Sequence, residues 1–289
     1  MVGDQEYLLD NRAAEAGRRF EALSALFDPS TFRHLSELGI DRGWRCWEIG
    51  AGGTSVVRWL AERAGPTGRV LATDIDISWA THAAGPTVEV RCHDVARDEP
   101  PAELFDLVHA RLVLVHVAER DRALRSMVQT LRPGGWLLIE DADPALQPLS
   151  CPDVHGSDQE LANTIRQGFR ALMSQRGVDL AYGRKLPRLL RDAGLVDVAA
   201  DAYFPLALPA CRPLETATIN LIRDQLIGNG IATAEEIETH LANVAAGRLD
   251  LAQPPMISAW GRRPSSRSEG SRSAATPPLP RDARASGTG

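Results

Sequence analysis

The chain has 289 residues, which is enough to bury one sizeable core and to carry a modest accessory element. Its formal net charge of -6 creates no basic field that would attract nucleic acid or an anionic membrane. The four cysteines are scattered without a C-x-x-C pair, and no apolar run is long enough to span a bilayer. Together with an acidic N-terminus, these features predict a cytoplasmic protein that binds neither nucleic acid nor membrane.

Residues 1–40 are predicted to form N-terminal helices that cover the functional site. Asp10 or Asn11 can cap the first helix. Apolar residues then recur at helical spacing, at Ala16, Phe20, Leu23, Leu26 and Phe27. Pro29 is expected to break this helix, because proline lacks the amide hydrogen that a helix interior needs. A second helix is predicted over 31–38.

A glycine-rich turn joins a predicted strand over 45–49 to a predicted helix over 55–64. Its sequence is Trp-Glu-Ile-Gly-Ala-Gly-Gly-Thr-Ser, at 47–55. Such a turn lets the backbone pass close to a ligand, and the helix N-terminus that follows offers free amide donors. A dehydrogenase fingerprint would have a third glycine where this chain has Ser55. The turn therefore predicts a ligand site that differs from a NAD site.

The residues after this turn continue to alternate between strand and helix. Strands are predicted over 69–76, 88–95, 104–111 and 131–140, with a helix from about Glu119 between the last two. Two of these strands end in acids, Asp74 and Asp94. A carboxylate at such a strand end can accept both hydroxyls of a ribose. The alternation predicts a doubly wound, mostly parallel α/β sheet with helices on both faces.

The second half of the chain adds further helices and two more strands. A proline-rich loop over 144–156 is followed by predicted helices over 158–176 and 186–193, a strand over 198–208, one or two helices over 213–246 and a strand over 256–260. These elements complete a seven-stranded sheet. The core is predicted to span 41–212 and 251–263, with a helical lid inserted over 213–250. Residues 264–289 lack apolar periodicity and are predicted to be disordered.

The sequence Glu48-Ile49-Gly50-Ala51-Gly52 resembles motif I of the class I S-adenosylmethionine methyltransferases. The run at 131–140 is similar to the "LRPGG" turn of the same family, and five matching pieces lie in order over 45–143. One departure is Thr54, which stands where many members carry a third glycine. The resemblance implies S-adenosylmethionine as the cofactor. It also implies a small-molecule acceptor, as in actinobacterial methyltransferases of this type.

The resemblance further implies which residues line the cofactor site. These are Glu48, Gly50, Ala51, Gly52, Asp74, Ile75, Asp94, Val95, Ala110 and Arg111. Asp74 is expected to bind the ribose, with Asp76 as a rival two residues on, and Asp94 is expected to lie near the adenine amine. The structural alternatives are a solvated strand-end acid for Asp74 and a plain turn residue for Asp94.

Transfer of a methyl group from a sulfonium needs an aligned nucleophile and, where that nucleophile carries a proton, a base. His116 follows the fourth strand at the ligand-binding edge of the sheet, where an imidazole could take this proton or be structural. Asp141 and Asp143 end the fifth strand and are expected to face the acceptor, which one of them could hold. Tyr7 could close over the cofactor or pack as a staple, and His155 could lie on the surface.

The favoured function is methylation of a small natural-product intermediate, with a phenol, an indole or an amine as acceptor and C-, N- and O-methylation all open. A nucleotide-binding protein that transfers no methyl group would use the same pocket. An RNA or protein methyltransferase is disfavoured, because the lid lacks a basic rim with interleaved aromatic residues. No metal is expected, since residues 109–113 contain no carboxylate. The chain is expected to be a monomer or a homodimer.

Overall fold

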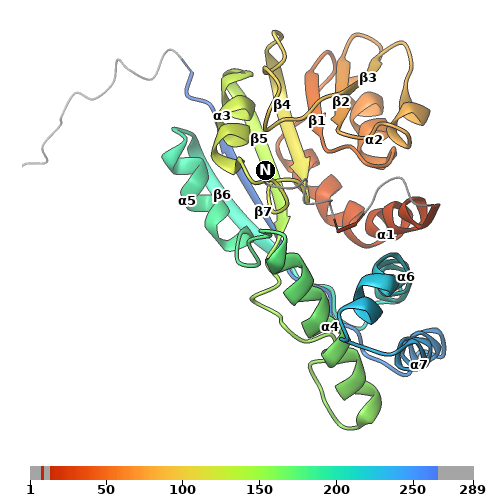
Figure 1. The fold of residues 1–289 in the computed structure, drawn as a ribbon. Coiled ribbons are helices and arrows are strands. Elements are labelled where there is room, and N and C mark those ends of the chain that lie inside the picture. The colour runs from red at the N-terminus through yellow and green to blue at the C-terminus, as the bar shows by residue number, and fades with distance from the viewer. Residues whose placement is uncertain (1–7, 10–13, 266–289) are drawn as a thin grey trace, which may run out of the picture.

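The computed structural model describes residues 8–9 and 14–265 (Figure 1). Its strands form one seven-stranded sheet in the order β3-β2-β1-β4-β5-β7-β6. The strands are β1 (Arg45–Ile49), β2 (Arg69–Asp74), β3 (Val88–Cys92), β4 (Phe105–Arg111), β5 (Leu131–Ala142), β6 (Val196–Tyr203) and β7 (Met256–Arg262). Strands β1 to β5 pair in parallel, and β7 is antiparallel to both β5 and β6. The mostly parallel seven-stranded sheet is thus confirmed, whereas Tyr7 and residues 266–289 lie outside the described part of the chain.

Helices cover both faces of this sheet (Figure 1). The α-helices of the described ranges are α1 (Ala14–Glu37), α2 (Ser55–Ala64), α3 (Arg120–Gln129), α4 (Ser157–Gln175), α5 (Leu186–Asp192), α6 (Cys211–Gly228) and α7 (Ala234–Ala245). On one face, Leu35 of α1 and Leu60 of α2 belong to a buried cluster with Leu107 and Leu138 of the sheet. On the other face, α3 and α5 join a separate buried cluster with the central strands. The doubly wound arrangement is therefore confirmed.

Helix α1 runs without a break from Ala14 to Glu37, so the expected break at Pro29 is wrong. A proline inside a helix removes one backbone hydrogen bond and costs about 3 kcal/mol. The turns after Pro29 are nevertheless anchored to the sheet, because Thr31 and His34 both bond to the buried carboxylate of Glu140. These contacts keep the second half of α1 helical and fix it across the sheet.

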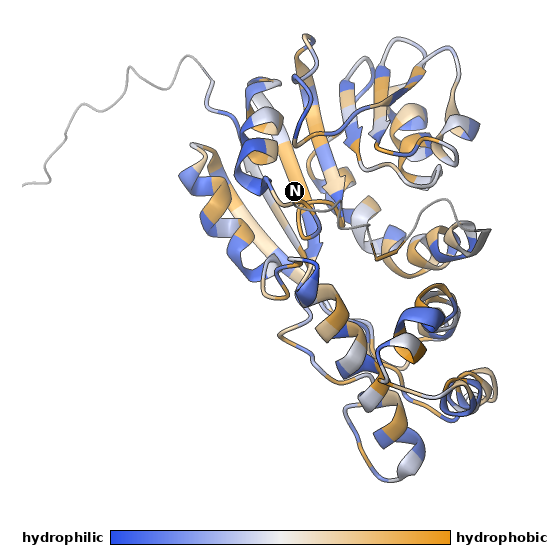
Figure 2. Cartoon of the chain, viewed as in Figure 1, coloured by the Kyte–Doolittle hydropathy of each residue, from blue (hydrophilic) through white to orange (hydrophobic). Residues whose placement is uncertain are grey.

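Helices α4, α6 and α7 lie together beyond the carboxyl ends of the parallel strands (Figure 1). Their shared buried cluster includes Ile165, Ile219, Ile222, Leu226 and Ile237. The predicted helical region over 213–246 is two helices, and α7 begins at a capping box formed by Thr233 and Glu236. Figure 2 shows hydrophobic residues along the central strands and hydrophilic residues on the outward sides of α3 and α5. No helix in the described ranges has the length and apolarity that a membrane span requires.

Candidate active site

The glycine-rich turn after β1 has a backbone that only glycine adopts without strain. Gly50 has a φ of +65° and Gly52 a φ of +54°, in the left-handed region. A Cβ atom added at Gly50 would lie 2.3 Å from Cγ2 of Val113, and one added at Gly52 would lie 2.8 Å from the ring of Phe20. The amide of Ala51 donates to the carbonyl of Thr73 at 3.0 Å, which fastens the turn to β2. The turn at 50–52 is therefore tightly held and presents mainly backbone atoms. We call it the glycine cradle.

Asp74 ends β2 beside this cradle and holds it in place. Its Oδ2 accepts the amide hydrogen of Gly52 at 2.9 Å, and its Oδ1 accepts that of Asp76 at 3.0 Å. Burial raises the pKa of Asp74 above its usual value, and these amide hydrogen bonds offset the rise only in part. A carboxylate has about four lone-pair positions, so about two remain for ligand hydroxyls. Asp74 can thus serve both the turn and a ribose.

The remaining strand-end residues suit an adenosine. Strands β2 and β3 are parallel neighbours, so the side chains that follow them lie at one edge of the sheet. Ile75 leaves 61% of its side chain exposed, which offers an apolar surface to a base. Asp94 is partly exposed and accepts the amide hydrogen of Ala96 at 2.9 Å, while Val95 is buried. With the glycine cradle and Asp74, these residues fit the S-adenosylmethionine that the resemblance implies.

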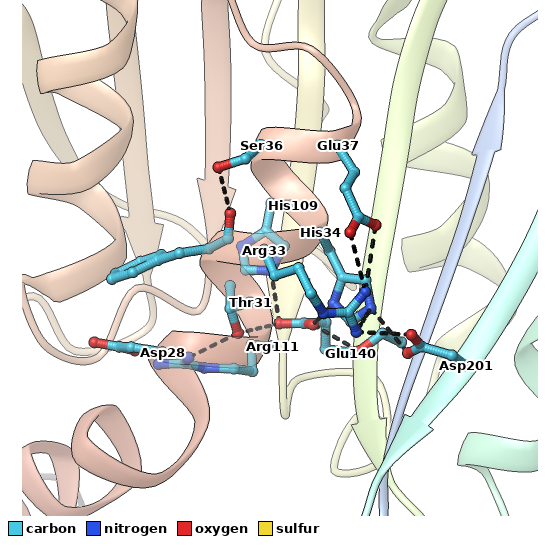
Figure 3. Close-up of polar contacts among 12 residues, drawn as sticks. Asp28, Thr31, Arg33, His34, Ser36, Glu37, His109, Arg111, Glu140 and Asp201 are labelled. Carbon is cyan, nitrogen blue, oxygen red and sulfur yellow. Dashed lines mark hydrogen bonds and ion pairs between the residues drawn. The ribbon is translucent and has the colours of Figure 1, made fainter.

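A row of polar side chains crosses the sheet beneath α1, and Figure 3 shows His109, Glu140 and Asp201 of this row. Neighbouring strands contribute Glu48 of β1, His109 of β4, Glu140 of β5, Ser258 of β7 and Asp201 of β6. The strand register places Glu48 beside His109, and it places Ser258 between Glu140 and Asp201. The row is held by hydrogen bonds, including one of 2.7 Å from the Ser258 hydroxyl to Oε1 of Glu140. We call these five residues the polar row.

His109 lies at the centre of the polar row. Its Nδ1 is 2.6 Å from Oε2 of Glu48, and its Nε2 is 3.4 Å from Oε2 of Glu140. Burial lowers the pKa of His109, but the two carboxylates outweigh this effect and raise the pKa to about 9. Burial likewise acts to raise the pKa of Glu140, but the hydrogen bonds from His109 and His34 hold it well below its usual range. His109 is therefore a cation with a buried carboxylate on each side.

The side chains of Glu48 and Arg111 have protein partners in place of the cofactor contact that the resemblance implies. Glu48 is 2% exposed and is bonded to His109. Arg111 donates from Nη1 to Oδ1 of Asp28 at 2.8 Å and to the hydroxyl of Thr31 at 3.0 Å (Figure 3). Their physical role in this structure is to join β1, β4 and α1. That either residue lines the cofactor site stays a prediction.

The chain turns sharply where it leaves β4. Leu112 has a φ of +57°, which is uncommon for a residue with a side chain and marks a turn that its surroundings enforce. Its amide donates to the carbonyl of Glu140 at 2.7 Å. Beyond this turn, Val115 and His116 line a cavity, whereas Val113 lies against Gly50 of the cradle. One short segment thus separates the cradle from the cavity.

The cavity has a volume of about 100 Å³ and lies between this segment and helices α1, α4 and α6. Its wall is largely apolar, with Leu23, Phe27, Phe169, Met173, Ile219 and Met256 among its residues. The polar wall residues are Arg19, His116, Arg166, Glu215, Thr218 and Gln253. Helix α6 supplies wall residues, as a lid over 213–250 predicts, but α4 supplies others that the sequence did not indicate.

His116 is placed on the cavity wall, as its position after the fourth strand predicts, but it is a weak base. Burial, followed by the positive charges of Arg19 and Arg120, lowers the pKa of His116 to about 3. The imidazole is therefore neutral near pH 7. A neutral imidazole can accept or donate a hydrogen bond, but a conjugate acid with this pKa holds a transferred proton only weakly.

Asp141 does not face the cavity, so the prediction that it does is wrong. Side chains alternate along a strand, and Asp141 therefore lies on the sheet face opposite to Glu140. Asp141 is fully buried there. Its carboxyl oxygens lie near the backbone amides of Leu114 and Val115 but form no hydrogen bond of full geometry with them. Burial outweighs these amides and raises the pKa of Asp141 to about 8. The carboxyl group is therefore largely protonated near pH 7.

Asp143 and His155 also lie outside the cavity wall. Asp143 is fully buried, and its carboxylate accepts hydrogen bonds from Nε of Arg184 at 2.7 Å and from Nη2 at 2.6 Å. Burial acts to raise the pKa of Asp143, but the bonds from Arg184 lower it below its usual value. His155 is 68% exposed. Asp143 therefore stabilises the turn after β5. The expectation that its carboxylate faces the acceptor is wrong.

A charged cluster that the sequence did not indicate contributes two residues to the cavity wall, Arg166 and Glu215. Arg166 of α4 donates from Nη2 to Oε2 of Glu215 at 3.0 Å, and Oε1 of Glu215 lies 3.0 Å from Nε2 of His240. All three side chains are buried. The only signal in the sequence is one apolar residue directly beside each of the three, namely Ile165, Leu214 and Leu241. Within the described ranges, no group of three or more His, Cys, Asp or Glu side chains could hold a metal ion.

Comparisons with known proteins agree with this geometry. A methyltransferase domain family matches residues 11–200. The ubiquinone/menaquinone biosynthesis C-methyltransferase of Bordetella parapertussis is 29% identical over 160 residues, which cover 48% of this chain and 61% of that protein. A methyltransferase of Strobilurus tenacellus is 34% identical over 158 residues, which cover 53% of each chain. The chain thus spans little more than half the length of these curated relatives.

Solved structures show the same fold at low sequence identity. Phosphoethanolamine N-methyltransferase 2 of Haemonchus contortus, in complex with S-adenosyl-L-methionine, superposes with a TM-score of 0.55 at 15% identity, covering 90% of this chain and 60% of that chain. The YcgJ protein of Bacillus subtilis gives a TM-score of 0.54 at 13% identity, covering 82% and 99%. With the family match over residues 11–200, these findings show that the chain belongs to the methyltransferase domain family and has the fold of the class I S-adenosylmethionine methyltransferases.

Proposed function

We propose that the chain is an S-adenosylmethionine-dependent methyltransferase that acts on a small, largely apolar molecule. One observation carries this proposal: the glycine cradle and the apolar cavity lie against the same short segment after β4. Val113 of this segment contacts the cradle, and Val115 and His116 line the cavity. A cofactor in the cradle and an acceptor in the cavity would thus both lie against residues 113–116.

The cofactor supplies an electrophilic methyl group on a sulfonium when it is bound. The chain binds it against the glycine backbone of the cradle and through the carboxylate of Asp74, and the apolar cavity wall excludes water. His116 is neutral, so its ring nitrogen can accept a hydrogen bond from a hydroxyl, indole or amine group and orient it. Alignment by the cavity therefore contributes more than proton removal by His116.

The acceptor class follows from the charges of the wall. Arg166 is paired with Glu215, so it offers little positive charge to an anionic acceptor. The relatives named above include a C-methyltransferase of quinone biosynthesis and a phosphoethanolamine N-methyltransferase. An apolar wall in which Arg166 and Glu215 pair with each other favours an uncharged aromatic acceptor over a phosphorylated one. A phenol or indole of secondary metabolism fits this class, with the methylated atom left to experiment.

The test is a screen of phenols, indoles and amines with S-adenosylmethionine that carries a deuterium-labelled methyl group. We expect labelled product from at least one uncharged aromatic acceptor, detected by mass spectrometry. The control is Gly52→Val, which places a side chain in a left-handed turn against Phe20 and should give no product. Binding of the cofactor without transfer to any acceptor would favour a non-transferring, nucleotide-binding protein.

A further inference from the structure

Gln253 is buried in the cavity wall with an unused hydrogen-bond donor. The residue precedes β7, is 5% exposed and lines the cavity. Among residues 8–9 and 14–265, none accepts a hydrogen bond from its Nε2. A buried donor without a partner destabilises the folded chain. A partner that enters the cavity would remove this cost.

The backbone around Gln253 is held firmly. Its amide donates to the carbonyl of Pro205 at 3.0 Å, and Pro254 and Pro255 follow it directly. Proline fixes φ and so restricts the backbone at both positions. On its other side, Ala252 donates its amide hydrogen to the carbonyl of Ser150 at 2.7 Å. The backbone that carries the side-chain amide of Gln253 is therefore fixed at the wall, which favours the positioning of a ligand.

The charged groups beside Gln253 already satisfy one another. Arg166 and Glu215 are paired at 3.0 Å, and Glu215 is also bonded to His240. Burial acts to raise the pKa of Glu215, but Arg166 and His240 lower it to about 2. The surrounding wall includes the rings of Phe27 and Phe169. This wall suits an apolar molecule better than a charged one. The Nε2 of Gln253 adds one neutral hydrogen-bond donor to it.

We propose that Gln253 positions the methyl acceptor by donating a hydrogen bond from Nε2 to a neutral oxygen, a hydroxyl or a carbonyl, of an otherwise apolar molecule. This inference rests on the proposed function and adds a defined contact to it. The side-chain amide of Gln253 takes no part in proton transfer. It selects an acceptor that carries oxygen over one of the same shape without it, because only the first satisfies the buried donor.

The test uses two probes that differ only in a hydroxyl group, p-cresol and toluene. Each is titrated by ligand-observed NMR into the full chain saturated with S-adenosylhomocysteine. We expect the wild-type chain to bind p-cresol about fivefold more tightly than toluene, the ratio for one neutral hydrogen bond. Gln253→Met keeps the volume but removes the donor and should lose most of this fivefold preference. Gln159→Met replaces an equally buried glutamine outside the cavity wall and should keep the fivefold preference.

A preference that persists in Gln253→Met, or that is absent from the wild-type chain, would overturn the proposal. Gln253→Leu is a second variant with the same expected result, and thermal unfolding checks that each variant is folded. The probes need no methyl transfer, so the two proposals fail separately. Cofactor binding without a p-cresol preference would remove the role of Gln253 alone. A p-cresol preference without cofactor binding would contradict the proposed function alone.

Discussion

Nδ1 of His109 lies 2.6 Å from Oε2 of Glu48, and both side chains are buried beneath α1. On the other side of the ring, Glu140 also accepts hydrogen bonds from Thr31 and His34 of that helix. Helix α1, which forms part of the cavity wall, is thus fastened to the centre of the sheet through Glu140, whose negative charge the His109 imidazolium balances. Removing one partner of such a buried pair leaves an uncompensated charge and is strongly destabilising.

Replacing His109 by glutamine should therefore destabilise the fold in a pH-dependent way. The folded pKa of about 9 is raised above the ordinary value of 6.5, so the stabilisation is complete below about pH 6.5 and is lost as pH rises through 9. We expect His109→Gln to lower the free energy of unfolding by about 3–5 kcal/mol at pH 6.5. The deficit should shrink toward pH 10, as measured by urea denaturation.

The matched control for this experiment is His82→Gln, at an exposed histidine of the loop after β2. It should leave the free energy of unfolding unchanged within about 0.5 kcal/mol at every pH. A deficit of His109→Gln that stays constant between pH 6.5 and 10 would mean that His109 is neutral in the folded chain.

Asp74→Ala should weaken the binding of S-adenosylmethionine by about 1.5–3 kcal/mol, the scale of a charge-assisted hydrogen bond to a ligand hydroxyl. The variant also removes the partner of the Gly52 amide, so Asp74→Asn, which keeps an acceptor oxygen, should lose less. Calorimetry measures both values, with Asp76→Ala as the comparison. A wild-type affinity in Asp74→Ala with a weakened Asp76→Ala would move the ribose contact to Asp76.

The alternation of strands and helices and the glycine cradle could be predicted from the sequence because local rules determine them. Glycines at 50 and 52 are required by a left-handed backbone, and acids at strand ends recur at the ligand edge of any parallel sheet. The partner of a buried charge depends instead on residues far along the chain. Glu48 finds His109 sixty-one residues later, a pairing that only the strand register produces. Pro29 similarly stays helical because of tertiary contacts, which outweigh its local preference.

Asp141→Asn should stabilise the chain at neutral and alkaline pH. The folded pKa is raised to about 8, so stability falls as pH rises from the ordinary value of 3.8 through 8, because the folded state must hold a proton or bury a charge. Asparagine has the same shape and cannot ionise. We expect the melting temperature of Asp141→Asn to exceed that of the wild type by a few degrees at pH 8 and to match it near pH 4.

The exposed Asp153, with a side chain 92% exposed, provides the control. Asp153→Asn should not change the melting temperature at either pH. A melting temperature of Asp141→Asn below that of the wild type at pH 8 would mean that the buried carboxylate is charged and paired in the folded chain.

His116→Asn should raise KM for the acceptor more than it lowers kcat, because the neutral imidazole orients the acceptor without holding its proton. The pH–rate profile between pH 6 and 9 should keep its shape in the variant, since a group with a pKa of about 3 does not titrate there. A loss of kcat of about 10²–10⁴ together with the loss of a limb near neutral pH would make His116 the general base.

The central claim is that the cradle at 50–52 and Asp74 bind S-adenosylmethionine. Isothermal titration calorimetry of the full chain with S-adenosylmethionine and, separately, with NAD tests this claim most directly. We expect one cofactor per chain with a dissociation constant in the micromolar range or tighter, and no heat of binding with NAD, because Ser55 replaces the third glycine of a dinucleotide site. Binding of NAD without binding of S-adenosylmethionine would contradict the account.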